Sequence, residues 1–361
     1  MIKNGYYYPD WIWKNKLHKN EETGEYEGNC VYNFIEGNRR AGKSVGVGIY
    51  ALQDFFRYGY KCVLLRRFLK DFENSNKPAM ENFWSKSWPF CPEAEGHELS
   101  FDGHAAYIDG VLFCYPVAIN LFNEYKNSNF DNVHTIIYDE FMTEQGSRLK
   151  GEVFAVYNLY DTIARGRDDA LQTTSVVFIS NVVSSVNDFH TEFGIDRELR
   201  RDTKRLYRPE QGYCLEVVKN EIVADAMTSS PIGRLMASGK TGREYLGYAQ
   251  DNQFKDNRDF VKKLSTQGEM YLYNITHEGK MYAVRFLPAL GYYYITDTAV
   301  NKEWIRNYAL TTDDHTVNTI VITAGPLKNS MKILKNAYNS GQLYFNSMRA
   351  KQMFADIYRY L

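Results

Sequence analysis

The chain has 361 residues, of which 44% are hydrophobic and 24% are charged, and its formal net charge is −1. This length predicts about two domains, because one domain typically has ~100–200 residues. No segment approaches the ~18 consecutive apolar residues of a membrane span, and the first residues lack the apolar core of a secretory signal. The five cysteines form no CxxC pair, which predicts reduced, buried thiols. A near-neutral protein contacts a polyanion only through a local patch.

Short apolar runs alternate with helix-length stretches in the first part of the chain. The runs are residues 30–36, 61–67, 134–140 and 174–180. This alternation is typical of a parallel α/β sheet. Asp109-Gly110 lies between two apolar pairs and predicts a β-hairpin, because this dipeptide tolerates the positive φ angles of a type I′ turn.

The pattern changes after residue 210. Residues 229–257 are polar, contain several glycines and show no clear period, as in a connector. Residues 270–286 and 291–299 predict an antiparallel meander, and residues 326–361 predict helix. We therefore predict a first domain at 1–210, a connector at 211–257 and a C-terminal domain at 258–361.

The strongest motif is a complete phosphate-binding signature, GxxxxGK[ST], between an apolar run and a helix-like segment. Its residues are Gly37, Asn38, Arg39, Arg40, Ala41, Gly42, Lys43 and Ser44. In such loops backbone N–H groups surround phosphate oxygens at a helix N-terminus. We expect Lys43 to reach the β- and γ-phosphates of ATP and the Ser44 hydroxyl to bind Mg²⁺. The alternative is a plain glycine turn between a strand and a helix.

A second motif supplies carboxylates. The apolar run at 134–138 leads into Asp139 and Glu140. Alone, an apolar strand with two acids at its end is often only a solvated strand end. Together with the phosphate loop, it predicts a Walker B motif in which Asp139 holds Mg²⁺ through its water shell. Glu140 would then polarise the attacking water as a general base.

Two further candidates follow the acids along the chain. Asn181 ends the run at 174–180, where ATPases of the additional-strand (ASCE) class carry a polar sensor of the γ-phosphate. Arg165 and Arg167 flank a glycine at the end of a helix-like stretch. They are either a solvated helix cap or an arginine finger that reaches the nucleotide of a neighbouring subunit, and the sequence leaves both interpretations open.

The C-terminal segment carries a local basic patch. Residues 326–361 have a net charge of +5, from six basic and one acidic side chain. Lys328, Lys332 and Lys335 are spaced by four and three residues and therefore share one face of a helix. That face either is simply solvated or contacts the DNA backbone.

Eight segments, in this order, resemble the DNA-packaging ATPases of Salasmaviridae-type small tailed phages, which are compact relatives of the terminase large subunit. The segments are GNRRAGKS, AYIDGV, NVHTIIYDEF, YDTIARGR, ISNVVSSVN, DNQF, LTTDDHTVN and SGQLYFN. The resemblance implies an α/β ASCE P-loop ATPase domain with a mostly parallel central sheet, a small connector, and an α+β C-terminal domain. The latter would be nuclease-like (RNase H-like) without catalysis. The resemblance also implies that Arg165 is the arginine finger that acts on the adjacent subunit.

The same resemblance implies an ATP-driven motor that moves double-stranded DNA into a preformed procapsid, with ATP and Mg²⁺ as its cofactors. It further implies a homopentameric ring docked on the phage portal in the host cytoplasm, with a structural packaging RNA in some relatives. One alternative is a terminase that also cuts DNA, for which Asp297, Asp313 and Asp314 are the metal-binding candidates. Another is an ATP-dependent DNA-binding switch that does not translocate.

Three features depart from the family's pattern. Arg39 and Arg40 stand where the family's loop has a glycine. Leu69 stands at the position of a family lysine proposed to act between subunits, so that only the adjacent Lys70 could replace it. The first 25 residues match no family segment, and we expect them to form a peripheral contact.

Overall fold

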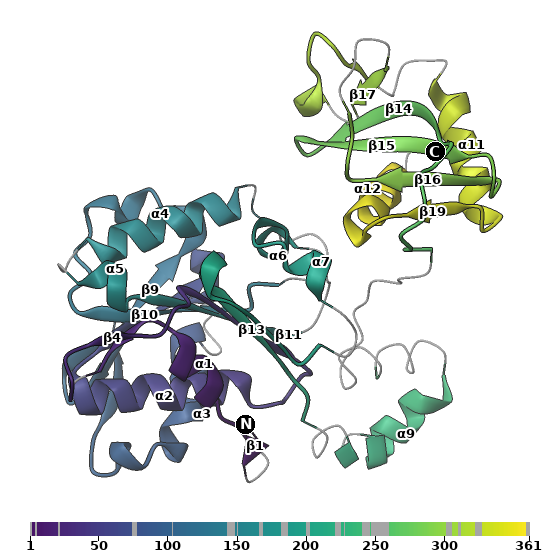
Figure 1. Ribbon diagram of the computed structural model, residues 1–361. Helices are drawn as coiled ribbons and strands as arrows, with labels where there is room; N and C mark the ends of the chain where they lie inside the picture. The colour runs from purple at the N-terminus through teal and green to yellow at the C-terminus, as the bar shows by residue number, and fades with distance from the viewer. Residues whose placement is uncertain are drawn as a thin grey trace. The chain divides into compact units, whose positions relative to one another are not determined.

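A computed structural model describes most of the chain: residues 2–3, 6–20, 22–73, 78–102, 104–142, 149, 151–165, 169–181, 187–199, 203–220, 225–226, 228–239, 246, 260–300, 305–309, 312–321 and 327–358. The chain folds as two compact units, Met1–Lys255 and Asp256–Leu361 (Figure 1). Within the described residues, no helix is both long enough and apolar enough to cross a membrane. All five cysteines are buried, as predicted, and none of them forms a disulfide in this structure.

The described residues of the first unit form a nine-stranded sheet with the order β12-β13-β5-β11-β10-β6-β9-β8-β7. The strands are β5 (Tyr32–Gly37), β6 (Lys61–Arg66), β7 (Leu99–Asp102), β8 (Ala105–Ile108), β9 (Val111–Ala118), β10 (Val133–Asp139), β11 (Ser175–Asn181), β12 (Arg205–Arg208) and β13 (Tyr213–Val218). The six strands from β13 to β9 are parallel to one another, and antiparallel strands lie at both edges. The four strands predicted from the apolar runs are therefore confirmed, as is the mostly parallel sheet.

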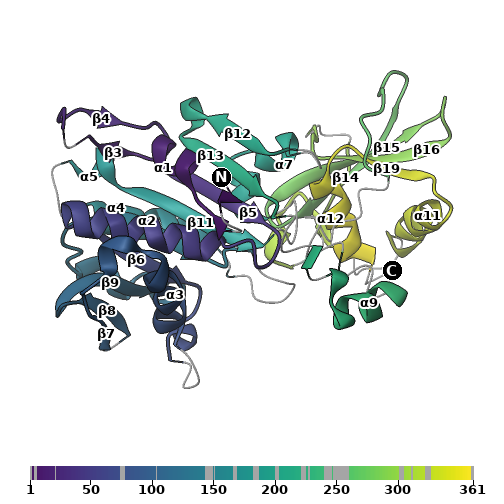
Figure 2. The same cartoon turned by 90° about the horizontal axis from the view of Figure 1, so that it is seen from below.

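Helices cover both faces of this sheet, which explains why its central strands read as continuous apolar runs. Strand β10, for example, is buried at every position. On one face lie α1 (Asp10–Asn15), α2 (Lys43–Tyr58) and α3 (Ala79–Ser87), and on the other α4 (Glu152–Ala164) and α6 (Asp188–Glu192) (Figure 1). In Figure 2, which shows the molecule from below, α2 lies across the sheet. Ile137 points to the α2 side and Tyr138 to the α4 side, in agreement with the two-residue period of a strand.

The shorter elements of the first unit are β1 (Ile2–Lys3), β2 (Tyr6–Tyr7), β3 (His18–Lys19), β4 (Tyr26–Glu27), α5 (Ala170–Thr173) and α7 (Ile195–Glu198). The predicted hairpin is present between β8 and β9, which pair in antiparallel fashion. Its turn residues Asp109 and Gly110 have φ angles of 51° and 78°. Both angles are positive, as a type I′ turn requires.

The first domain extends further along the chain than the sequence pattern suggested. We placed its end at residue 210, but β12 and β13 continue the sheet to Val218, and β13 pairs with β5. The apolar run of β13 is interrupted by Glu216, whose carboxylate accepts hydrogen bonds from Tyr7 and Arg205. The predicted connector also contains a helix, α9 (Pro231–Ser238).

The N-terminal segment is part of the core of the first unit, contrary to the expectation of a peripheral contact. Tyr7 and Ile12 are almost completely buried. Gly46 of α2 lies against the backbone of Tyr7, where an added Cβ atom would come within 2.2 Å of the carbonyl oxygen. The segment therefore joins the phosphate-loop helix α2 to strand β13.

This packing predicts that the N-terminal segment stabilises the first unit. We expect Ile12→Ala to lower the free energy of unfolding by about 2–5 kcal/mol, because it leaves a cavity at a site with no solvent exposure. Urea unfolding of the full chain measures the change. Val111→Ala, at a half-exposed position, is the control and should have little effect. Equal stabilities of the two variants would contradict the prediction.

The described part of the second unit has a six-stranded sheet with the order β18-β17-β14-β15-β16-β19. Its elements are β14 (Met270–His277), β15 (Lys280–Leu287), β16 (Tyr292–Thr296), β17 (Asn307–Ala309), β18 (Ile320–Val321), β19 (Leu343–Phe345), α11 (Leu327–Asn339) and α12 (Met348–Tyr358). The predicted meander is confirmed, because β14, β15 and β16 pair in antiparallel order. The other three strands join in parallel.

The prediction of continuous helix over 326–361 is wrong for its middle part. Helix α11 is followed by Gly341, which has a φ angle of 71°, and then by strand β19. Leu343 and Phe345 are buried on either side of the partly exposed Tyr344. Three residues are too few to show a strand period in the sequence, and pairing with β16 decides their conformation.

Candidate functional site

A cavity of about 580 Å³ lies at the carboxyl ends of the parallel strands of the first unit. It is lined by the phosphate loop from Arg40 to Ser44, by the acids Asp139 and Glu140, and by Asn181. The strands β5, β11 and β10 are neighbours, so three motifs far apart in the sequence meet at one edge of the sheet. This edge is where ligands bind in open parallel sheets.

The backbone of the loop requires glycine at two positions. A Cβ atom on Gly37 would lie 2.1 Å from the carbonyl oxygen of Val218, so the loop can begin beside β13 only with glycine. Gly42 has a φ angle of 87° and immediately precedes α2. The N-terminus of this 16-residue helix faces the cavity, which brings the N–H groups of its first turn and the positive end of the helix dipole there.

Lys43 is held inside the loop. Its side chain is buried, and Nζ donates hydrogen bonds to the carbonyl oxygens of Gly37 (3.1 Å) and Asn38 (2.7 Å). Nζ also lies 3.3 Å from Oδ1 of Asn181. The predicted sensor and the predicted phosphate-binding cation are therefore in direct contact.

Burial lowers the pKa of Lys43 to about 7, although the carboxylates of Asp139 and Glu36 oppose the shift. Phosphate oxygens favour the charged amine and raise this pKa again. We therefore expect Mg-ATP binding at pH 8.5 to take up about one proton from solution, and binding well below pH 7 to take up none at Lys43. Titration calorimetry in buffers of different ionisation enthalpy measures this uptake.

The matched variant for this experiment is Lys43→Arg, because a guanidinium stays protonated at both pH values. We expect the variant to bind without the proton uptake. If the natural protein takes up no proton at pH 8.5, Lys43 is already charged in the empty cavity and the prediction is wrong.

The acids and the serine form the other side of the cavity. The Ser44 hydroxyl donates a hydrogen bond to Oδ1 of Asp139 (3.3 Å). Burial raises the pKa of Asp139, and the Arg66 guanidinium opposes this shift. Glu140 has a φ angle of 61°, and its N–H donates to the carbonyl of Ile179 (2.8 Å). Its side chain is 71% exposed and borders the cavity.

The hydroxyl of Ser44 and the carboxylate of Asp139 fit Mg²⁺, a hard cation that prefers oxygen ligands and retains several waters. Their separation of 3.3 Å allows both to act on one ion, directly or through its water shell. The phosphate loop and the α2 N-terminus likewise fit the polyphosphate of a nucleotide. The site thus suits the two cofactors expected from the motifs.

Arg66 is a site residue that none of the sequence motifs includes. Its guanidinium bridges the two acids, with distances of 2.6 Å to Oδ2 of Asp139 and 2.7 Å to Oε2 of Glu140. Arg66 is the last residue of β6, next to β10 in the sheet. A charged residue at the end of an apolar run was the available signal, since parallel strands end at the same edge.

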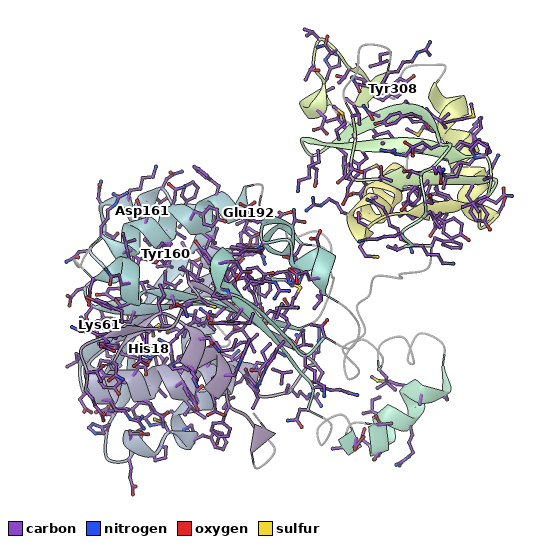
Figure 3. The ribbon with its side chains drawn as sticks, in the orientation of Figure 1. His18, Lys61, Tyr160, Asp161, Glu192 and Tyr308 are labelled. Atoms are coloured by element: carbon purple, nitrogen blue, oxygen red, sulfur yellow. The ribbon has the colours of Figure 1, made fainter. Side chains whose placement is uncertain are left out.

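Arg165 lies outside its own chain's cavity. It directly follows α4 and forms an ion pair with Asp161, one helical turn earlier. The Asp161 side chain is exposed, and Figure 3 shows this residue on α4 of the first unit. The Arg165 side chain is 62% exposed, and Arg167 lies outside the described residues. An arginine at this position is available to another molecule.

Of the residues that depart from the family's pattern, only some line the cavity. Arg40 lines the cavity and has a φ angle of 64°, whereas Arg39 is exposed on the loop and helps to lower the pKa of Lys43. Lys70 is exposed on a short turn, with Nζ 4.9 Å from the centre of the Phe68 ring. It does not line the cavity.

Comparison with known proteins finds relatives of this chain among phage proteins. A model of the Podovirus DNA encapsidation protein (Gp16) family matches residues 17–361. The chain belongs to this family. A DNA packaging protein of Bacillus phage phi29 is 27% identical over 332 residues, which cover 91% of this chain and 93% of the phage protein. A DNA packaging protein of Bacillus phage B103 is 24% identical over 331 residues, or 91% and 97% of the two chains.

Two solved structures share the fold of this encapsidation-family chain. A chain of the bacteriophage phi29 genome packaging motor assembly superposes with a TM-score of 0.68 at 24% identity, over 99% of both chains. The Phi-28 gp11 DNA packaging motor superposes with a TM-score of 0.61 at 18% identity, over 99% of this chain and 97% of that one. The first 16 residues, which include the buried Tyr7 and Ile12, lie outside the family model.

The basic face expected in the C-terminal unit lies on α11. Met331 and Leu334 of this helix are buried and form its inward side. Lys332 is exposed, whereas Lys335 is partly covered and has Nζ 4.8 Å from the centre of the Tyr358 ring. The side chain of Lys328 lies outside the described residues.

The carboxylates weighed for a nuclease have other partners. Asp297 accepts a hydrogen bond from the Asn346 side chain (2.5 Å). Asp314 accepts from the backbone N–H groups of Glu278 (2.9 Å) and Gly279 (2.7 Å), and so caps the turn between β14 and β15. The Asp313 side chain is not among those described. Among the residues that the structure describes, no group of three His, Cys, Asp or Glu side chains could hold a metal ion.

Proposed function

We propose that this encapsidation-family chain is an ATPase that drives double-stranded DNA into a preformed phage procapsid. The observation that carries the proposal is the meeting of Lys43, the Ser44–Asp139 pair and Glu140 in one 580 Å³ cavity. These are the cation, the metal ligands and the base that phosphoryl transfer to water requires. Membership in the encapsidation family supports DNA as the transported polymer.

The residues have distinct roles in this mechanism. The Lys43 ammonium exchanges the carbonyls of Gly37 and Asn38 for the β- and γ-phosphate oxygens. Asn181, already in contact with Lys43, reports whether the γ-phosphate is present. Glu140 accepts the proton of the attacking water. Bound Mg²⁺, held by Ser44 and Asp139, supplies neutralisation of the phosphate charge.

Arg165 completes the site of an adjacent subunit in this proposal. Its exposure and its absence from its own cavity support action in trans. We extend the proposal to a homopentameric ring docked on the portal in the host cytoplasm, as the family resemblance implies. The same resemblance extends the proposal to a structural packaging RNA as an additional partner.

The test is ATP turnover with and without double-stranded DNA and purified empty capsids. We expect DNA and capsids together to stimulate turnover and DNA to become protected from added nuclease. Turnover without DNA protection would favour the non-translocating switch. Shortened DNA would favour the nuclease alternative.

The α11 lysines give a separate prediction about DNA binding. Replacing Lys328, Lys332 and Lys335 with glutamine should flatten the slope of log affinity against log salt by up to ~3 units, because each phosphate contact contributes about 0.9. Basal ATP turnover should not change, since this face is not part of the cavity. The control replaces the exposed Lys14 and Lys126 of the first unit. An unchanged slope would mean that the α11 face is only solvated.

A further inference from the structure

Three buried polar side chains lie beneath the candidate active site and have no part in the mechanism above. Arg67 directly follows β6, Tyr138 immediately precedes Asp139, and Glu152 is the first residue of α4. All three are more than nine-tenths buried. Burying two opposite charges is costly unless they are paired and hydrogen-bonded with good geometry.

Arg67 is the centre of this cluster. Its Nε donates to Oε1 of Glu152 (3.0 Å), and a terminal nitrogen lies 2.7 Å from the same oxygen. The guanidinium also donates to the carbonyl oxygens of Phe141 (2.7 Å) and Glu140 (3.4 Å). The Tyr138 hydroxyl donates to Oε1 of Glu152, and its ring centre is 5.8 Å from the guanidinium carbon.

This arrangement joins two parts of the chain whose relative position matters for the mechanism. One is the backbone at Glu140, where the proposed base stands on a left-handed residue. The other is the start of α4, whose end carries Arg165. The apolar side chains of α4 also pack on the sheet, but apolar contacts are non-directional. A planar guanidinium with donors in a fixed fork sets direction as well as distance.

The length of α4 amplifies any change at its start. Thirteen residues at 1.5 Å each give a helix of about 20 Å. A tilt of roughly 10° at Glu152 would therefore move Arg165 by about 3 Å. A displacement of this size separates a hydrogen-bonded arginine from a phosphate oxygen.

We propose that Arg67 is a positioning residue that holds Glu140 and the start of α4 in one fixed relation. In this way Arg67 places the base Glu140 of its own subunit. It also places Arg165, which acts on the nucleotide of the adjacent subunit. The proposal rests on the proposed function, because it takes Glu140 as the base and Arg165 as the trans-acting arginine.

The first experiment does not depend on activity. Hydrogen exchange of the full-length Arg67→Lys variant is measured by mass spectrometry, since lysine keeps the charge and loses the fork. We expect peptides covering 138–142 and 152–158 to exchange at least ~10-fold faster and α2 to stay unchanged. Tyr138→Phe, which only removes the hydroxyl, should show a smaller effect at 152–158. Arg57→Lys, at an exposed ion pair with Glu93, is the control. Unchanged exchange in both 138–142 and 152–158 would overturn the proposal.

The second experiment separates the two roles by mixing subunits. Lys43→Ala chains keep Arg165 and should restore turnover to Arg165→Ala chains. We expect Lys43→Ala/Arg67→Lys chains to restore at least ~10-fold less, while Lys43→Ala/Arg57→Lys chains restore as well as Lys43→Ala. Equal restoration by all three would overturn the role of Arg67 in placing Arg165 while supporting Arg165 itself.

Failure of the underlying function gives a different result. If Lys43→Ala chains restore no turnover to Arg165→Ala chains in rings shown to be mixed, Arg165 does not act in trans. The proposed role of Arg67 in placing a trans-acting arginine is then wrong as well. The exchange experiment then still decides whether Arg67 joins Glu140 to α4. If Arg67→Lys does not fold, Tyr138→Phe still tests the Glu152 side of the cluster, and unchanged exchange at 152–158 in that variant would overturn the proposal.

Discussion

Glu140→Gln is expected to bind Mg-ATP and to hydrolyse it about 10²–10⁴-fold more slowly, because general-base catalysis contributes a factor of this size. The amide keeps the shape of the side chain but cannot accept the proton of water. The loop, Lys43 and the Ser44–Asp139 pair stay in place, so nucleotide binding should persist. Single-turnover hydrolysis and equilibrium nucleotide binding, measured on the same preparation, separate the two effects.

Two further variants are compared with Glu140→Gln. Lys43→Ala should lose turnover and weaken binding, since it removes the cation that faces the phosphates. Glu210→Gln changes an exposed glutamate elsewhere in the first unit and should have no effect. Hydrolysis by Glu140→Gln at the natural rate would remove Glu140 from the mechanism.

Arg165→Ala is expected to lower turnover by about 10³-fold, the lower end of the contribution of an arginine finger. The ion pair with Asp161 is exposed, and exposed pairs at this helical spacing contribute only ~0.3–0.5 kcal/mol. The arginine can therefore leave Asp161 for a phosphate at small cost. Because it lies outside its own cavity, nucleotide affinity of the isolated chain should not change.

The decisive measurement mixes two inactive proteins. Arg165→Ala chains retain an intact phosphate loop, and Lys43→Ala chains retain the arginine, so some interfaces of a mixed ring combine both. We expect partial recovery of turnover, which rises with the proportion of Lys43→Ala chains and then falls. Arg57→Ala removes another exposed, ion-paired arginine and should stay active. Absence of recovery in demonstrably mixed rings would contradict action in trans.

Much of the proposed nucleotide site was predictable because its motifs are local. The phosphate loop needs glycines at two positions and a lysine and serine at fixed spacing, and the structure places Gly37, Gly42, Lys43 and Ser44 as that spacing requires. An apolar run followed by acids predicted both strand β10 and the position of Asp139. Parallel strands end at one edge, so the sequence also brought Asn181 to the same cavity.

The remaining features depend on which strands and helices become neighbours. Arg66 and Arg67 are adjacent in sequence, yet one contacts the acids of the cavity and the other contacts Glu152 on the opposite face of the sheet. Only the pairing of β6 with β10 makes this division visible. The burial of Ile12 and the place of β13 inside the sheet likewise rest on contacts between residues far apart in the chain. Local patterns determine where elements begin and what chemistry they carry, whereas burial and long-range pairing decide which of those residues act together.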